Sequence, residues 1–231
     1  MAEELSSAAA PGRHQHFEIE PRRGVGYRIA RGIIMGLTRV WFRPQVHLDA
    51  PLPSTGPVLV APIHRSNLDF LFAVLLTDRK LFFMAKDSLW KSKLLGRFLV
   101  AMGAFPVHRE SADRESLNRA EEVLARGEVL VLFPEGTRQE GPEVATLLEG
   151  ATYLASKTGA PIVPLGIGGS DRAMPKGAKF PKPVKVKVVA GQPLAPAERS
   201  ASGRVSRAQV KVATAALSEA IQAVYDRSLK P

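Results

Sequence analysis

The stretch VLVAPIHRSNLD, residues 58–69, indicates the fold of this chain. It opens with the apolar run Val58 to Ala61, which has the length and composition of a buried strand, and leads through polar residues into Leu68 to Leu76, which reads as a buried helix. Similar segments alternate along the rest of the chain. Further strands are expected at Leu81 to Ala85, Ala104 to Val107, Val129 to Phe133 and Pro161 to Ile167, and a half-exposed strand near an edge is expected at Val184 to Val188. Further helices are expected at Trp90 to Met102, from Ser111 to Gly127, at Val144 to Lys157 and at Ala208 to Leu229. This alternation predicts a single α/β domain with a largely parallel central sheet flanked by helices.

The composition narrows the classes of protein to consider. The 231 residues, 45% of them hydrophobic, suffice for one domain with a full core. The absence of cysteine excludes disulfides, thiolate metal sites, iron–sulfur clusters and a thiol nucleophile. No run approaches the ~20 apolar residues of a membrane-spanning helix, and the N-terminus lacks the apolar core of a secretion signal. The 32 Lys and Arg against 22 Asp and Glu give a net charge of +10, which points to a polyanion or an anionic surface as partner.

Residues 1–23 are poor in apolar side chains and are expected to form a flexible N-terminal tail, whereas residues 24–48 contain an amphipathic helix. At about 100° per residue, one face of that helix is apolar and the other is rich in arginine. The apolar face collects Ile29, Ala30, Ile33, Ile34, Leu37, Val40 and Trp41, and the other face collects Arg28, Arg31, Arg39 and Arg43. Two interpretations stay open: the helix packs on the domain with its charges in water, or it lies in a lipid interface with its arginines at anionic head groups.

Polar residues follow four of the expected strands. Ligands usually bind beyond the carboxyl ends of parallel strands, so these residues are the candidates for a functional site. They are His64 and Asp69 after the first strand, Lys86 after the second, Arg109 after the third, and Glu135, Gly136, Thr137 and Arg138 after the fourth. Together they suit a general base beside an anion-binding pocket. The alternatives are a capping or loop role for His64 and Asp69, and an ion pair between Glu135 and Arg138 across a tight turn.

Other catalytic motifs are missing. The sequence contains no Gly-x-Ser-x-Gly elbow, no Gly-x-Gly-x-x-Gly and no nucleotide-triphosphate loop, so serine hydrolysis and nucleotide chemistry have no support. A basic stretch from Arg172 to Lys187 has no acidic residue; it is either a solvated face or a landing surface for lipid head groups or carrier phosphates. A nucleic-acid-binding domain is a remote alternative, because aromatic residues make up only 6% of the chain and no helix-turn-helix or zinc pattern occurs.

Four blocks of the sequence resemble those of the glycerolipid acyltransferases, specifically the 1-acyl-glycerol-3-phosphate (lysophosphatidate) acyltransferases. They are, in order, HRSNLD at 64–69, GAFPVHR at 103–109, FPEGTR at 133–138 and APIVPL at 160–165. The resemblance covers roughly residues 58–194. FPEGTR after a strand, with a His-x4-Asp motif upstream, is a highly specific combination.

The resemblance implies transfer of a fatty acyl group from acyl-CoA or acyl-carrier protein to a hydroxyl of lysophosphatidate, giving phosphatidic acid without a metal or other cofactor. His64 would be the general base and Asp69 its orienting partner, while Lys86, Arg109 and the turn from Glu135 to Arg138 would hold the glycerol phosphate. Residues 49–231 would form the acyltransferase domain, and residues 24–48 would bind anionic lipids at the cytoplasmic face of the membrane, as in a peripheral or monotopic protein. The alternative acceptors are another lysophospholipid or a glycolipid.

Overall fold

The computed structural model describes residues 24–107, 114–199 and 205–230, so the expected N-terminal tail lies outside the described residues. One sheet runs through the molecule, with strand order β1-β7-β6-β2-β5-β3-β4. The strands are β1 (Gln45–Leu48), β2 (Val58–Pro62), β3 (Leu81–Lys86), β4 (Ala104–Val107), β5 (Val129–Val131), β6 (Ile162–Gly168) and β7 (Lys187–Ala190). Every pairing is parallel except that of β6 with β7, which confirms the predicted α/β fold with a largely parallel sheet.

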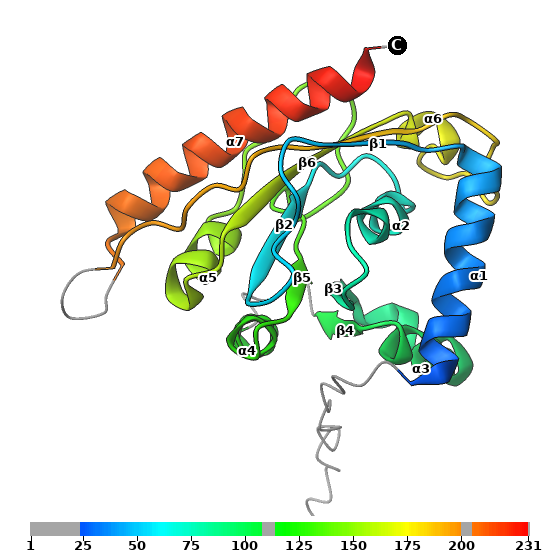
Figure 1. Ribbon diagram of the computed structural model, residues 1–231, viewed down its shortest axis with the longest axis horizontal. Helices are drawn as coiled ribbons and strands as arrows, with labels where there is room; N and C mark the ends of the chain where they lie inside the picture. Colours follow the sequence, from blue (N-terminus) through cyan, green and yellow to red (C-terminus); the bar gives the residue numbers. More distant parts are fainter. Residues whose placement is uncertain (1–23, 108–113, 200–204, 231) are drawn as a thin grey trace, which may run out of the picture.

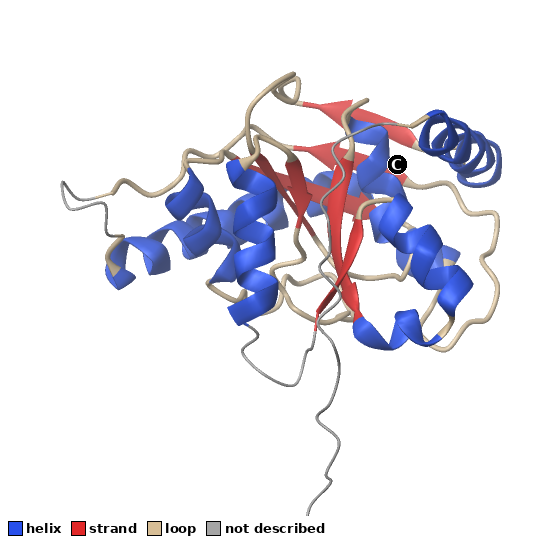
Figure 2. Cartoon of the chain, turned by 90° about the horizontal axis from the view of Figure 1, so that it is seen from below, coloured by secondary structure: helices blue, strands red, loops and turns tan. Residues whose placement is uncertain are grey.

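Helices cover both faces of the sheet (Figures 1 and 2). One layer contains α4 (Arg114–Ala125), α5 (Gly150–Thr158) and the long α7 (Arg207–Leu229). The other layer contains α1 (Val25–Phe42), α2 (Asp69–Ala73) with its 3-10 continuation η1 (Val74–Leu76), and η2 (Asp87–Lys91) followed by α3 (Lys93–Ala101). The short α6 (Ser170–Ala173) follows β6. Helix α7 packs closely on β6, because a Cβ atom at Gly166 would lie only 2.4 Å from the carbonyl oxygen of Val224.

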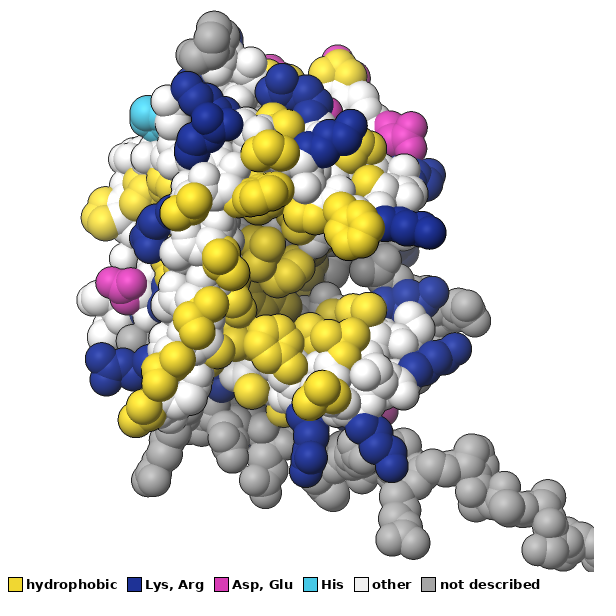
Figure 3. Space-filling model, turned by 90° about the vertical axis from the view of Figure 1, so that its right-hand side faces the viewer, with side chains coloured by type: hydrophobic (Ala, Val, Ile, Leu, Met, Phe, Trp, Pro, Cys, Tyr) yellow, Lys and Arg dark blue, Asp and Glu magenta, His cyan; other side chains and the backbone are white. Residues whose placement is uncertain are grey.

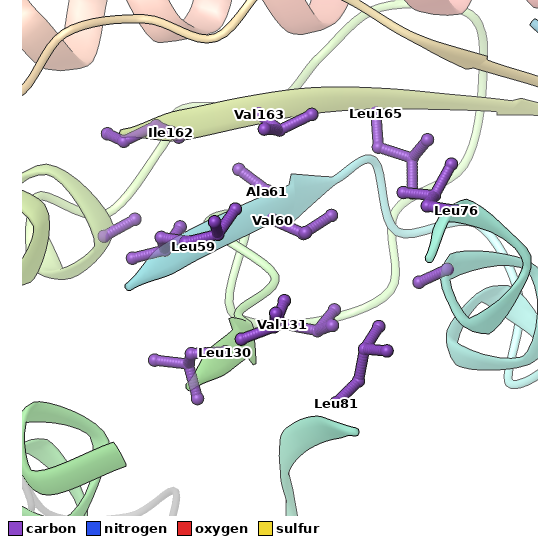
Figure 4. Close-up of a cluster of buried hydrophobic side chains, with 14 of the residues drawn as sticks. Leu59, Val60, Ala61, Leu76, Leu81, Leu130, Val131, Ile162, Val163 and Leu165 are labelled. Atoms are coloured by element: carbon purple, nitrogen blue, oxygen red, sulfur yellow. The ribbon is translucent and has the colours of Figure 1, made fainter. Parts of the chain in front are cut away.

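The core lies between these layers and explains the unbroken apolar runs of the sequence. Strand β2 is fully buried because it is central in the sheet and covered on both faces. Its side chains contact those of β5 and β6 (Figure 4), and the labelled group comprises Leu59, Val60, Ala61, Leu76, Leu81, Leu130, Val131, Ile162, Val163 and Leu165. This apolar packing fixes the position of β2 in the sheet, and with it the point where the following loop begins.

Three local expectations need correction. Strand β1 was not expected; it lies at the sheet edge, pairs with β7 and falls within the region 24–48 that the sequence assigned to the amphipathic helix. Strand β7 begins at Lys187, later than the expected start at Val184, although the predicted alternation is present: Val186 and Val188 are buried and Lys185 is exposed. The helix expected from Val144 begins only at Gly150, because the N–H groups of Val144, Ala145 and Leu148 donate to Gln222, Glu135 and Pro134 instead of forming helical hydrogen bonds.

Helix α1 packs on the domain through Arg31, Thr38 and Phe42, which are its buried residues. The Arg31 side chain is buried, and its guanidinium donates to the carbonyl oxygens of Val74 at 3.1 Å, Thr77 at 2.6 Å and Asp78 at 2.8 Å. Phe42 packs edge-on against Phe72 of α2, with the ring centroids 5.4 Å apart. The expectation that Arg31 faces water or lipid head groups is therefore wrong, because this side chain attaches α1 to η1 and to the two residues that follow it.

The apolar stripe of α1 faces solvent as a consequence. Its exposed side chains form a row along one side of the molecule (Figure 3); they are Val25, Ile29, Ile33, Leu37, Val40 and Trp41. Exposed apolar residues of η2 and α3 lie on the same face, and lysines and arginines surround it. Among the described residues, no helix combines the length and the apolar character needed to cross a bilayer. A contiguous exposed apolar surface of this kind is typical of a binding surface.

Candidate active site

The polar residues that follow β2, β5 and β3 lie at one edge of the sheet. These three strands are adjacent and parallel, so their carboxyl ends point the same way. The loop after β2 contains His64, the loop after β5 contains Glu135 to Arg138, and β3 ends at Lys86. Arg109, expected after the edge strand β4, lies outside the described residues. The structure thus places the described candidates at a common edge, as the parallel sheet requires.

His64 and Asp69 form a direct pair. The Nδ1 atom of His64 lies 3.0 Å from Oδ2 of Asp69, and both side chains are buried. His64 precedes α2, and Asp69 is the first residue of that helix, so the turn between them closes a separation that a continuous helix would leave open. A carboxylate only accepts hydrogen bonds, which assigns the proton to Nδ1 and leaves Nε2 as the basic atom of the ring.

The Asp69 carboxylate is held by main-chain donors. Its Oδ2 atom accepts hydrogen bonds from the N–H groups of Arg65 and Ser66, each at 2.7 Å, in addition to the His64 ring. These hydrogen bonds fix the position of the Asp69 carboxylate. The carboxylate can therefore orient the imidazole and stabilise the imidazolium that forms when Nε2 takes a proton. Its other oxygen, Oδ1, is buried and has no hydrogen-bond partner among the described residues.

The His64 ring and main chain are both fixed by the loop after β5. The ring stacks on Phe133, with 4.1 Å between centroids. The His64 N–H donates to Oε2 of Glu135 at 2.8 Å, and the His64 carbonyl oxygen accepts from the N–H of Gln139 at 2.9 Å. Two loops distant in the sequence therefore behave as one unit around the histidine, which limits its rotation.

Glu135 was expected to help hold the acceptor, and the structure shows its carboxylate hydrogen-bonded inside the protein. Both of its oxygens contact Nη1 of Arg65 at 2.9 Å, and they also accept from the N–H groups of His64 and Ala145. Neither the Arg65 nor the Glu135 side chain is accessible to solvent beyond 1%. Glu135 uses its hydrogen-bonding capacity inside the protein. Its partner is Arg65 rather than Arg138, which was the partner considered from the sequence.

Arg65 is a structural residue that sequence reasoning missed. Beyond Glu135, its guanidinium donates to the carbonyl oxygens of Gly141 at 3.0 Å and Glu143 at 2.6 Å. It also lies 5.3 Å from the centre of the Tyr225 ring of α7. Burial raises the pKa of the Tyr225 phenol, although the Arg65 charge opposes that shift. No local signal distinguishes Arg65 from a solvent-exposed arginine, because all of these partners lie far away in the sequence.

The remaining candidates keep their side chains available. Among the described residues, neither Arg138 nor Lys86 has a hydrogen-bond or ion-pair partner for its side chain. Thr137 is exposed and accepts from Nε2 of Gln139 through its hydroxyl. Gly136 adopts φ +71, and a Cβ atom there would lie 2.8 Å from Leu148. The turn therefore needs glycine, and it presents a hydroxyl and a guanidinium without internal partners of opposite charge. Within the described ranges, no group of three or more His, Asp or Glu side chains gathers as metal ligands would.

Replacing Glu135 tests whether it acts inside the protein. Glu135→Gln leaves the buried Arg65 charge uncompensated, so we expect the free energy of unfolding to fall by about 3–5 kcal/mol. Urea denaturation measures this, and Glu143→Gln, at an exposed position in the following loop, should change stability by less than about 0.5 kcal/mol. A Glu135→Gln variant as stable as the parent protein would show that this pair does not hold the two loops.

The sequence matches one family of known proteins. Residues 43–168, more than half of the chain, match the family model described as Acyltransferase. The chain is 31% identical over 151 residues to a 1-acyl-sn-glycerol-3-phosphate acyltransferase of Bacillus subtilis, which covers 65% of this chain and 73% of that protein. It is 30% identical over 131 residues to a chloroplastic 1-acyl-sn-glycerol-3-phosphate acyltransferase of Brassica napus, covering 55% of this chain and 38% of that protein.

A solved structure shares the fold. The 1-acyl-sn-glycerophosphate acyltransferase PlsC of Thermotoga maritima superposes with a TM-score of 0.69 at 22% sequence identity, over 91% of this chain and 85% of that one. At 22% identity, the likeness of the two structures shows a shared fold. Membership of a family is shown by the family-model match and by the identity to the Bacillus protein. This chain belongs to the acyltransferase family.

Proposed function

We propose that the protein transfers a fatty acyl group from an acyl thioester to a hydroxyl of 1-acyl-glycerol-3-phosphate, forming phosphatidic acid. The observation that supports this most directly is the 3.0 Å contact of His64 Nδ1 with Asp69, at the strand edge that also presents Arg138. The relatives named above are acyltransferases of that acceptor. The donor is acyl-CoA or acyl-carrier protein, whose thioester is already activated for attack.

The chemistry needs a base and an anion site. Nε2 of His64 takes the proton of the acceptor hydroxyl while the oxygen of that hydroxyl attacks the carbonyl carbon of the thioester. The tetrahedral intermediate then expels the thiolate, which takes the proton from the imidazolium, so that an ester and a free thiol result. Asp69 stabilises the imidazolium between these two proton transfers. No covalent enzyme intermediate is required, in keeping with a chain that has no cysteine.

The acceptor phosphate is assigned to the cationic side chains around this edge. Arg138 supplies a planar guanidinium suited to two phosphate oxygens, and Lys86 supplies a point charge at the end of β3. Arg109 is proposed as a third phosphate ligand. Thr137 adds a hydroxyl, and the Gly136 turn sets the direction of both neighbouring side chains. Glu135 is left out of this set because its oxygens are bonded inside the protein.

The exposed stripe of α1 is assigned to the lipid surface. A single α-helix that exposes Ile33, Leu37 and Val40 can bury that stripe at the acyl boundary of one leaflet. The lysines and arginines around the stripe suit anionic head groups. The protein is therefore proposed to bind peripherally at the cytoplasmic face of a membrane, where its lipid acceptor also resides.

Removing the base should abolish turnover. We expect His64→Ala to lower kcat by about 10²- to 10⁴-fold, because that is the usual contribution of a positioned general base. His47→Ala, at an exposed histidine of β1, is the matched control and should retain full activity. Steady-state assays with lysophosphatidate and acyl-CoA measure both. Near-normal turnover in His64→Ala would remove the proposed base.

Removing a phosphate ligand should weaken acceptor binding. We expect Arg138→Ala to raise the KM for lysophosphatidate by about tenfold or more, the value of a charge-assisted hydrogen bond, with a smaller effect on the KM for the thioester. Arg207→Ala removes the same charge from the exposed start of α7 and serves as the control. An acceptor KM equal to that of the parent protein would contradict the assignment of Arg138.

Charges on the stripe should release the protein from lipid. We expect Ile33→Asp/Leu37→Asp to lower binding to anionic vesicles at least tenfold, because burial of two large apolar side chains is lost. The fold should be unaffected, since both side chains face solvent. Vesicle sedimentation measures the binding, and Val212→Asp/Leu229→Asp on α7 is the matched control. Equal binding by the α1 variant and the parent protein would contradict the interfacial role of α1.

A further inference from the structure

The segment PKGAKFPKPVKV, residues 175–186, connects α6 to β7 and is called the basic loop below. Its four lysines are exposed: Lys176, Lys179, Lys182 and Lys185. Phe180 stands among them with 81% of its surface exposed, among the largest exposures of any large hydrophobic residue in the described chain. The sequence alone left two explanations for these lysines, a solvated face or a landing surface. An aromatic side chain largely exposed to water within a lysine cluster favours the second.

The basic loop has a defined position. Its first part is held by the N–H of Lys182, which donates to the carbonyl oxygen of Ala173 at 2.7 Å. The residue before the loop, Met174, accepts at its carbonyl oxygen from the hydroxyl of Ser66 at 3.1 Å. Ser66 is one of the two residues whose N–H groups hold the Asp69 carboxylate. The loop is therefore attached directly to the framework of the His64 site.

The loop also lies beside the C-terminal end of α1. The N–H of Val186 donates to the carbonyl oxygen of Phe42 at 3.2 Å, and the Arg43 guanidinium donates to the carbonyl oxygen of Pro183 at 3.4 Å. Figure 1 shows α6 and the segment after it next to this end of α1. Arg43 itself has φ 45, the one positive φ outside glycine among the described residues. The two elements thus form one continuous surface.

The charges of this surface are mostly uncompensated. Lys176 lies 3.4 Å from Glu140, but no carboxylate among the described residues pairs with Lys179, Lys182 or Lys185. An open pocket at the same end of α1 adds two more cations, because its lining comprises Arg39, Arg43, Pro44, Val46 and Leu75. Exposed cations around apolar side chains match the chemistry of a bilayer that presents phosphate groups above acyl chains.

We propose that the basic loop is a second membrane contact, in which Phe180 enters the interface of an anionic bilayer while Lys179 and Lys182 bind lipid phosphates. This inference rests on the proposed function, because that proposal places the neighbouring α1 on the same bilayer. The exposed apolar residues of η2 and α3 already share the face of the α1 stripe. The basic loop adds a contact at the C-terminal end of α1, where it is attached to the framework of the His64 site through Ser66.

Quenching of single indoles by brominated lipid tests the two contacts separately. The chain has two tryptophans, Trp41 on the stripe of α1 and Trp90 in η2. Trp90→Phe leaves Trp41 as the only reporter of α1, whereas Trp41→Phe/Trp90→Phe/Phe180→Trp places the only indole in the basic loop. Each variant is mixed with vesicles of equal parts brominated phosphatidylcholine and phosphatidylglycerol. We expect quenching of both indoles.

The other outcomes are distinct. Quenching of Trp41 without quenching of the loop indole overturns the second contact and leaves the proposed role of α1 intact. Quenching of the loop indole alone supports the loop contact and contradicts the assignment of α1. Absence of quenching in both variants overturns both proposals.

Charge removal in the otherwise natural chain provides a second test that needs no tryptophan changes. We expect Lys179→Gln/Lys182→Gln to weaken binding to phosphatidylglycerol-containing vesicles by about fivefold per lysine and to leave binding to pure phosphatidylcholine unchanged. Arg207→Gln/Lys211→Gln removes the same charge from α7, on the opposite face of the sheet, and should have a much smaller effect. Equal losses in the two double variants would show attraction by net charge alone and overturn the loop contact.

Discussion

The buried ion pair between Arg65 and Glu135 joins the loops that follow β2 and β5, and the geometry around His64 depends on it. The two strands pair in parallel with Val58 opposite Val129, so both loops leave the sheet at the same end. Arg65 and Glu135 then draw these loops together, and Glu135 and Gln139 hold the N–H and carbonyl groups of His64. Two desolvated charges are stable only in each other's presence, so neither loop can move alone without exposing an unpaired charge to an apolar interior.

The parts of the fold that were predictable are those set by local chemistry. Strands such as β2 are covered on both faces, and their unbroken apolar composition identifies them without knowledge of their neighbours. The parallel arrangement follows from the alternation of strands with helices, and it places the residues after each strand at one edge. The contact of His64 with Asp69 depended on one condition, that His64 precedes the helix and Asp69 lies in its first turn, and α2 meets it by beginning at Asp69.

The parts that sequence reasoning missed depend on partners far along the chain. In the sequence, Glu135 is a carboxylate in a turn after a strand, which is typical of a ligand-binding residue. Its side chain is buried because it pairs with Arg65, which lies 70 residues away in the sequence. Strand β1 is short and exposed, and it exists because β7 offers it a free edge. The amphipathic pattern of α1 located the helix but not its orientation, since pattern alone assigns the apolar face to the core. Here the carbonyl groups of Val74, Thr77 and Asp78 bind Arg31, and the apolar stripe is left facing solvent.

The junction between α1 and β1 is short, because only Arg43 and Pro44 separate Phe42 from Gln45. The proline ring restricts one of the few rotatable bonds there, and Arg31 fixes the helix further along. On a bilayer, such a molecule would travel as a rigid body at one height above the lipids. Its encounters with acceptor would then occur by lateral diffusion in a plane and from a constant approach direction, and their frequency would follow the number of acceptor molecules per unit of membrane area rather than the bulk concentration.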